Sequence, residues 1–150
     1  MRGGFWTKGR KGKPRQSDLK RAMSTAYYAM FHALCRNCAD SFIGTSCALR
    51  SQMAWRQVYR AVDHGHAKTQ CMNQGVMCQF PPEIQRFAVK LIELQNRRHQ
   101  ADYDPLSSFT RADVWTETDA TRTVIKELKN SSIKDKRAFA AWTALKHRKP

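Results

Sequence analysis

The stretch that decides the fold is IQRFAVKLIELQNRRHQADYDP, residues 84–105. Its first half repeats apolar side chains at helical spacing, which predicts a long helix that buries one stripe. The apolar positions are Ile84, Phe87, Ala88, Leu91 and Leu94. Continued toward the C-terminus, the stripe reaches Arg98 and then Ala101 or Asp102, before Pro105 ends the helix. An arginine on the core-facing line of a helix is unfavourable unless it is paired or faces a site.

The polar end of this helix has two interpretations. Arg98 and Asp102 are four residues apart, as are His99 and Tyr103, so each pair lies on one helix face. A buried Arg98–Asp102 ion pair would tie the helix end to the rest of the bundle. Alternatively, these side chains form a functional site, and the density of polar groups before Pro105 favours that interpretation.

Two segments together resemble the HEPN superfamily: STAYYAMFH, residues 24–32, and RHQADYDP, residues 98–105. The most similar members are small bacterial proteins with an AYYAxFH first helix and an R-x4-Y motif, and the resemblance covers roughly residues 16–128. It implies a helical bundle that dimerises and, in many members, cleaves RNA without a metal. The family hallmark is an arginine, a polar follower, and a histidine about four to six positions on. Arg98 and His99 match the first two, whereas Tyr103 stands in place of the histidine.

The resemblance implies a reaction in which the ribose 2′-hydroxyl attacks the adjacent phosphate and leaves a 2′,3′-cyclic phosphate. Arg98 would stabilise the phosphorane, because its guanidinium stays protonated and matches phosphate oxygens. Histidine is the side chain whose ordinary pKa lies closest to neutrality, so His99 would transfer the proton. Tyr103, with an ordinary pKa near ~10, would donate or orient, and Asp102 would hold Arg98 or His99 in place. We therefore predict a toxin-like or defence ribonuclease that needs no metal and no cofactor.

The rival interpretation is a non-catalytic binding module. The same bundle would hold RNA, a nucleotide or a partner protein, with the Arg98–Asp102 pair purely structural. Such a chain would be one member of a toxin–antitoxin pair. Tyr103 in the histidine position favours this alternative, whereas His99 beside Arg98 favours the enzyme.

Charge is the second strong signal. The chain has 27 Lys+Arg against 12 Asp+Glu, a net charge of +15. A small domain needs only about 2–8 net charges for solubility, so the excess predicts contact with a polyanion, here RNA. The predicted nucleic-acid contacts are Arg10, Lys11, Lys13, Arg15 and Arg97. Solubilising tails are the alternative interpretation of the basic ends.

The five cysteines raise the question of zinc. Cys35-x-x-Cys38, with His64, His66 and Cys71, supplies suitable ligand types. The first pair falls within a predicted helix, however, and no second CxxC accompanies it, whereas structural zinc sites draw paired ligands from short knuckles. We therefore expect small buried hydrophobes and no metal. An odd number of cysteines without a secretory signal also predicts no disulfide framework.

The predicted organisation is a disordered basic arm (residues 1–16), a helical bundle (17–130), and a C-terminal helix with a basic tail (131–150). Helices are expected at 17–37, with Ser17 as the N-cap, at 53–62, and from 82 to about 103. A further helix follows the Thr110–Asp113 capping box, and a last one follows Ser132. Residues 66–80 are expected to form a loop or a short helical turn. The fold class is all-α: an up-and-down bundle of four main helices with an appended C-terminal helix. No apolar run approaches the ~20 residues of a membrane span, so we expect a cytoplasmic protein.

The first helix also carries a second, half-polar stripe. Its members are Arg21, Thr25, Tyr28, His32 and Cys35. A single core cannot use such a stripe, so we expect a homodimer, although Tyr28 and His32 could instead be core residues with satisfied polar tips.

Arg60 is also followed by two histidines, His64 four positions later and His66 six positions later. The arginine, Arg60, is followed by Ala61, so we treat this spacing as coincidence, although the histidines could line a groove.

Overall fold

The structure, a computed structural model, describes residues 15–149, and these contain seven helices and no strand. The helices are α1 (Gln16–Ile43), α2 (Gln52–Ala61), α3 (His64–Cys71), α4 (Gln74–Met77), α5 (Pro82–Tyr103), α6 (Arg111–Asn130) and α7 (Ile133–Ala144). The predicted all-α class is therefore confirmed. Most of the predicted basic arm lies outside the described residues, including Arg10, Lys11 and Lys13. Arg15 is described and is exposed just before α1.

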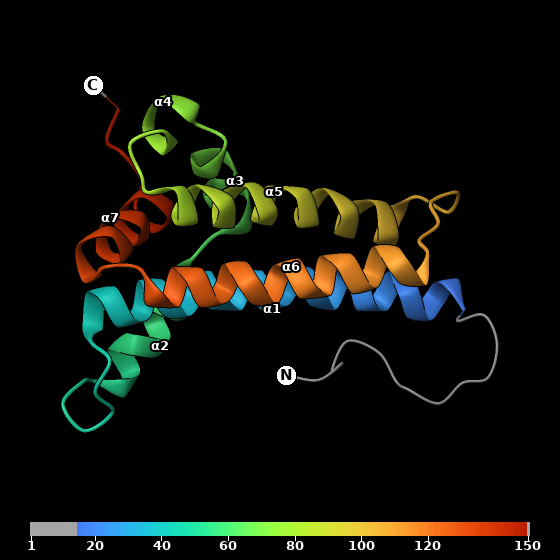
Figure 1. Cartoon of the computed structure of the whole chain (residues 1–150). Coiled ribbons are helices and arrows are strands. Elements are labelled where there is room, and N and C mark those ends of the chain that lie inside the picture. The colour runs from blue at the N-terminus through green and yellow to red at the C-terminus, as the bar shows by residue number, and fades with distance from the viewer. Residues whose placement is uncertain (1–14, 150) are drawn as a thin grey trace.

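Three long helices, α1, α5 and α6, lie side by side and pack on one another (Figure 1). The predicted apolar stripe of α5 is buried against this core, from Ile84 to Leu94. At one end, α7 packs on α1 and α3. Its Phe139 is fully buried edge-on against Phe87 and Phe80, with ring centroids 5.9 and 5.7 Å apart. This aromatic cluster lies at one end of the core. Arg98 lies toward the other end of α5.

The helix α1 is longer than predicted and begins differently. It continues past Asn37 to Ile43, because α7 buries this end: the Asn37 amide donates to the Lys136 carbonyl at 3.0 Å. Polar residues that suggest the end of a helix in the sequence therefore remain helical here, because contacts with a distant segment support them. The predicted Ser17 N-cap is wrong, since Arg15 is the cap residue and makes no side-chain cap bond. Instead, the Gln16 amide exchanges two hydrogen bonds with the Phe109 backbone, at 2.8 and 2.9 Å.

The predicted set of four main helices is not confirmed. The segment predicted as the second main helix is α2, which packs on α1 and has no buried residue. Part of the segment predicted as a loop or turn forms α3, which is capped by Asp63 and packs on α5 and α7. At eight residues, α3 is too short to show a clear apolar period in the sequence. The capping box of Thr110 and Asp113 and the Ser132 cap of α7 are confirmed.

Among residues 15–149, none of the helices combines the length and the apolar character that a membrane crossing needs.

Candidate functional site

Arg98, near the end of α5, lies over two aromatic rings of α1. Its guanidinium carbon is 5.4 Å from the ring centroid of Tyr27 and 5.2 Å from that of Tyr28. Cation–π contacts of this length contribute about 0.5–1 kcal/mol at partly exposed sites. The two segments that carry the family resemblance, far apart in sequence, therefore meet at this guanidinium.

The predicted pair of Arg98 and Asp102 is present, but it is only partly buried. Nε of Arg98 lies 3.4 Å from Oδ2 of Asp102, and the two side chains are 24% and 37% exposed. Asp102 also accepts a hydrogen bond from the Ser24 hydroxyl at 3.1 Å. The Arg98 Nε itself is buried and has no partner in hydrogen-bonding geometry. A pair this open contributes at most about 1 kcal/mol to stability, so it gives a weak structural reason for an arginine here.

His64, the first residue of α3, belongs to the same cluster. Its ring stacks on Phe31, with centroids 3.6 Å apart and planes 13° apart. Its Nδ1 lies 2.5 Å from the Tyr27 hydroxyl. Burial, and then the positive charge of Arg98, lower the pKa of His64, so its neutral form is favoured. Burial raises the pKa of Tyr27, so the phenol stays protonated and shares one hydrogen bond with the imidazole Nδ1.

His64 is the site residue that the sequence interpretation missed. The sequence suggests only a zinc ligand or a groove residue at this position, and no local pattern connects it with Tyr27 or Arg98. Only the packing of α3 beside α1 and α5 brings these side chains together, so the signal is tertiary.

His99 and Tyr103 form a separate pair. Their ring centroids are 4.8 Å apart, and both side chains are exposed. Within residues 15–149, neither makes a hydrogen bond to Arg98 or Asp102. The four predicted catalytic residues therefore form two i,i+4 pairs on adjacent faces of the helix end, one packed on α1 and one facing solvent.

Arg97, predicted to contact nucleic acid, is half-buried and lies near the start of α6. Hydrogen bonding from the Thr110 backbone is the main cause of a lowered pKa at Asp113, and the charge of Arg97 lowers it further. Arg97 thus interacts electrostatically with the N-terminal end of α6.

The candidate zinc ligands do not come together. Over residues 15–149, no group of three or more His, Cys, Asp or Glu side chains is arranged to hold a metal ion, and all five cysteines are free. Cys35, Cys38 and Cys71 are buried, and burial raises their thiol pKa values to about 12, 11 and 12. These thiols stay protonated at neutral pH and pack as small hydrophobes.

His64 gives a pH prediction. The folded-state pKa of His64 lies below the ordinary value of 6.5. The stability that this histidine contributes is therefore complete above pH 6.5 and is lost as the pH falls from there through the folded-state pKa. We expect the free energy of unfolding to fall between about pH 7 and pH 5, and to fall less steeply in His64→Gln. Urea unfolding at several pH values measures this. The matched control, His99→Gln, removes an exposed histidine and should keep the wild-type slope. An unchanged slope in His64→Gln would show that this histidine does not control the transition.

No family model, curated protein or solved structure matches this chain.

Proposed function

We propose that this protein is a HEPN-type RNA endonuclease of the toxin or defence kind, which cleaves by 2′-hydroxyl attack and needs no metal. The observation that carries the proposal is the position of Arg98. Its guanidinium is held over Tyr27 and Tyr28 at one side and is only loosely paired with Asp102, and the Arg98 side chain as a whole remains 24% exposed. An arginine oriented in this way can present its remaining N–H groups to an anion, and guanidinium matches phosphate oxygens.

The proposed roles follow from these positions. Arg98 contacts the scissile phosphate and stabilises the charge that develops on the phosphorane. Asp102, held by Ser24, positions Arg98. His99 follows Arg98 at the open end of α5, where a strand bound by Arg98 reaches its imidazole for proton transfer. Tyr103, whose ring contacts that of His99 at a tilt of 47°, orients it.

Basic residues outside this cluster support RNA as the substrate. The net charge of +15 attracts a polyanion, and Arg15 is exposed at the start of α1. We assign Arg10, Lys11 and Lys13 to backbone contacts on the basis of sequence alone.

A binding module is the second candidate, and one observation favours it. Within the described residues His99 has no hydrogen-bond partner, whereas a catalytic histidine is usually oriented by a carboxylate or carbonyl. In that case Arg98 would hold RNA, a nucleotide or a toxin–antitoxin partner without any reaction.

The first test is RNA cleavage by Arg98→Ala. Wild-type protein should cleave labelled RNA in the presence of chelator and leave 2′,3′-cyclic phosphate ends. Arg98→Ala should lower the rate by roughly 10²–10³, because one preorganised charge contact at the phosphorane is lost. Its thermal unfolding should change little, since the ion pair with Asp102 is partly exposed.

The matched control for that experiment is Arg122→Ala, which removes an exposed arginine from α6 and should keep the wild-type rate. Wild-type protein that leaves RNA intact in chelator would exclude the endonuclease. Cleavage that survives Arg98→Ala undiminished would exclude the assigned role of Arg98.

We further propose that the chain acts as a homodimer, with two copies of the Arg98 cluster facing one RNA. Exposed aromatic side chains near this cluster support a protein-binding face: Tyr28 is 39% exposed and Tyr103 is 69% exposed. A stable dimer buries about 1,200–2,000 Å² in total. Light scattering at micromolar concentration should give twice the chain mass of 17.3 kDa. A mass of one chain at both low and moderate salt would contradict the dimer.

A further inference from the structure

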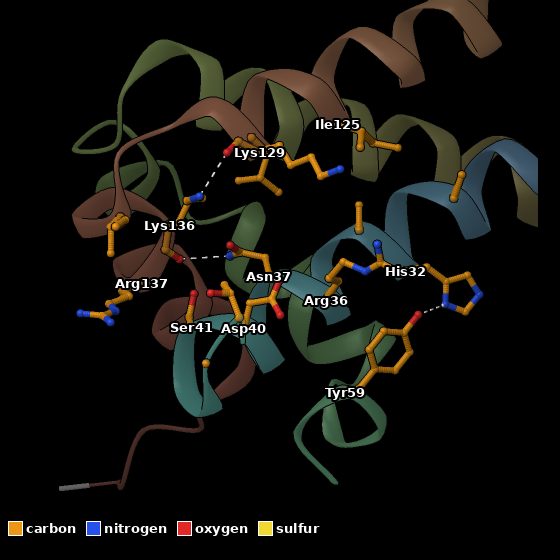
Figure 2. Close-up of a pocket in the computed structure, with 16 residues that line it drawn as sticks. His32, Arg36, Asn37, Asp40, Ser41, Tyr59, Ile125, Lys129, Lys136 and Arg137 are labelled. Atoms are coloured by element: carbon orange, nitrogen blue, oxygen red, sulfur yellow. Dashed lines mark hydrogen bonds between the residues drawn. The ribbon is translucent and has the colours of Figure 1, made fainter. Parts of the chain in front are cut away.

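A pocket lies away from Arg98, where α1 meets α6 and the start of α7. Its volume is about 430 Å³, and we call it the α1/α6/α7 pocket (Figure 2). Small-molecule sites have volumes of about 300–1,000 Å³. Part of its lining is apolar, from Ala29 and Ala33 of α1 and from Ile125 and Leu128 of α6. The pocket therefore offers an apolar surface large enough for a planar group the size of a nucleobase.

Four cations line the same pocket: Arg36, Lys129, Lys136 and Arg137. The Lys136 ammonium donates to the Lys129 carbonyl at 3.1 Å. Within residues 15–149, the side chains of Arg36, Lys129 and Arg137 form no ion pair. In Figure 2, Arg36 and Lys129 extend from α1 and α6 into the space between these helices.

One carboxylate, Asp40, belongs to the described lining, and its charge is already compensated. Its Oδ1 accepts a hydrogen bond from Trp55 Nε1 at 2.9 Å and lies 3.4 Å from the Arg50 guanidinium. The guanidinium of Arg50 stacks over the Trp55 ring, 4.5 Å from its centroid. The pocket therefore keeps an unbalanced positive charge beside its apolar surface, which suits a ligand with a planar apolar part and a phosphate.

Aromatic rings connect the pocket with the Arg98 cluster. The Tyr59 hydroxyl and His32 Nδ1, both in the pocket lining, are 2.7 Å apart, and their rings stack. The His32 ring is 6.4 Å from that of Tyr28, which lies under the Arg98 guanidinium. Ring contacts through Tyr28, His32 and Tyr59 therefore lead from the Arg98 guanidinium to the pocket lining.

We propose that the α1/α6/α7 pocket binds one nucleoside monophosphate unit. The base lies on the apolar side of the pocket beside Tyr59, and the phosphate is held by Arg36 and Lys129. The unit is a nucleotide of the RNA strand that passes Arg98, and to that extent the proposal rests on the proposed function. A free mononucleotide has the same chemistry, and the experiment separates the two sources.

The experiment is calorimetric titration of the full-length protein with three probes: inorganic phosphate, adenosine 3′-monophosphate, and a short 2′-O-methyl RNA that lacks the attacking hydroxyl. The mononucleotide should bind more tightly than phosphate, since only the mononucleotide uses the apolar surface. The double variant Arg36→Gln/Lys129→Gln should weaken mononucleotide binding by about tenfold or more, because it removes two charge-assisted contacts. A third variant, Ala33→Phe, fills the pocket without changing its charge and should also weaken binding of the mononucleotide, but not of phosphate.

The matched control is Arg122→Gln/Lys126→Gln, which removes the same two charges from exposed positions of α6 outside the pocket lining. It should weaken mononucleotide binding by about twofold or less, as expected for a long-range charge effect. Equal losses in the test and control variants, or a mononucleotide that binds no better than phosphate, would overturn the proposal.

The RNA probe identifies the source of the nucleotide. If the pocket is part of the RNA path, the mononucleotide should compete with the 2′-O-methyl RNA, and Arg36→Gln/Lys129→Gln should weaken both. Loss of mononucleotide binding alone would support a free nucleotide as the ligand and overturn the RNA assignment. Arg98→Ala should leave mononucleotide binding intact, so a failure of the cleavage proposal is distinguishable from a failure of this one.

Discussion

The contact between the Arg98 guanidinium and the rings of Tyr27 and Tyr28 is the interaction on which the proposed site depends. It joins the end of α5 to the middle of α1 and gives a charged group a position on a stripe that is otherwise apolar. Burial of the stripe from Ile84 to Leu94 sets the rotation of α5, and this rotation directs Arg98 toward α1. Because Asp102 is partly exposed and loosely paired, the aromatic rings and the carboxylate together hold the guanidinium.

The electrostatics of the cluster follow from the same packing. Burial, and then the charge of Arg98, lower the pKa of His64 and favour its neutral form, which shares a hydrogen bond with the Tyr27 hydroxyl. Uncharged aromatic and polar groups therefore pack against the guanidinium, and the proposed function assigns its remaining N–H groups to an anion. The α1/α6/α7 pocket repeats the combination of cations beside aromatic and apolar surface farther along α1. A single-stranded nucleic acid needs both kinds of surface, one for its phosphates and one for its bases.

Local signals in the sequence predicted much of the fold. The apolar period of α5 and the caps at Thr110 and Ser132 depend on neighbouring residues, and each is confirmed. The helix expected at 53–62 is present as α2, but its lack of buried residues was not predicted. The end of α1 and the short α3 depend on contacts between distant segments, so sequence spacing alone did not predict them. The candidate site likewise combines contacts that the sequence predicted with contacts that it did not. The Arg98–Asp102 and His99–Tyr103 pairs were predicted from helical spacing, whereas the contact of Arg98 with the tyrosines and the role of His64 arise from helix packing.

The most direct test of the central claim is a crystal structure of the protein with a 2′-O-methyl RNA strand bound. Our account predicts an RNA phosphate within about 3 Å of the Arg98 guanidinium, with Tyr27 and Tyr28 still beneath it. The contrary result would be RNA bound elsewhere on the molecule, with Arg98 unchanged beside Asp102 and no phosphate within reach. That result would make Arg98 a structural residue and remove the basis for the proposed site.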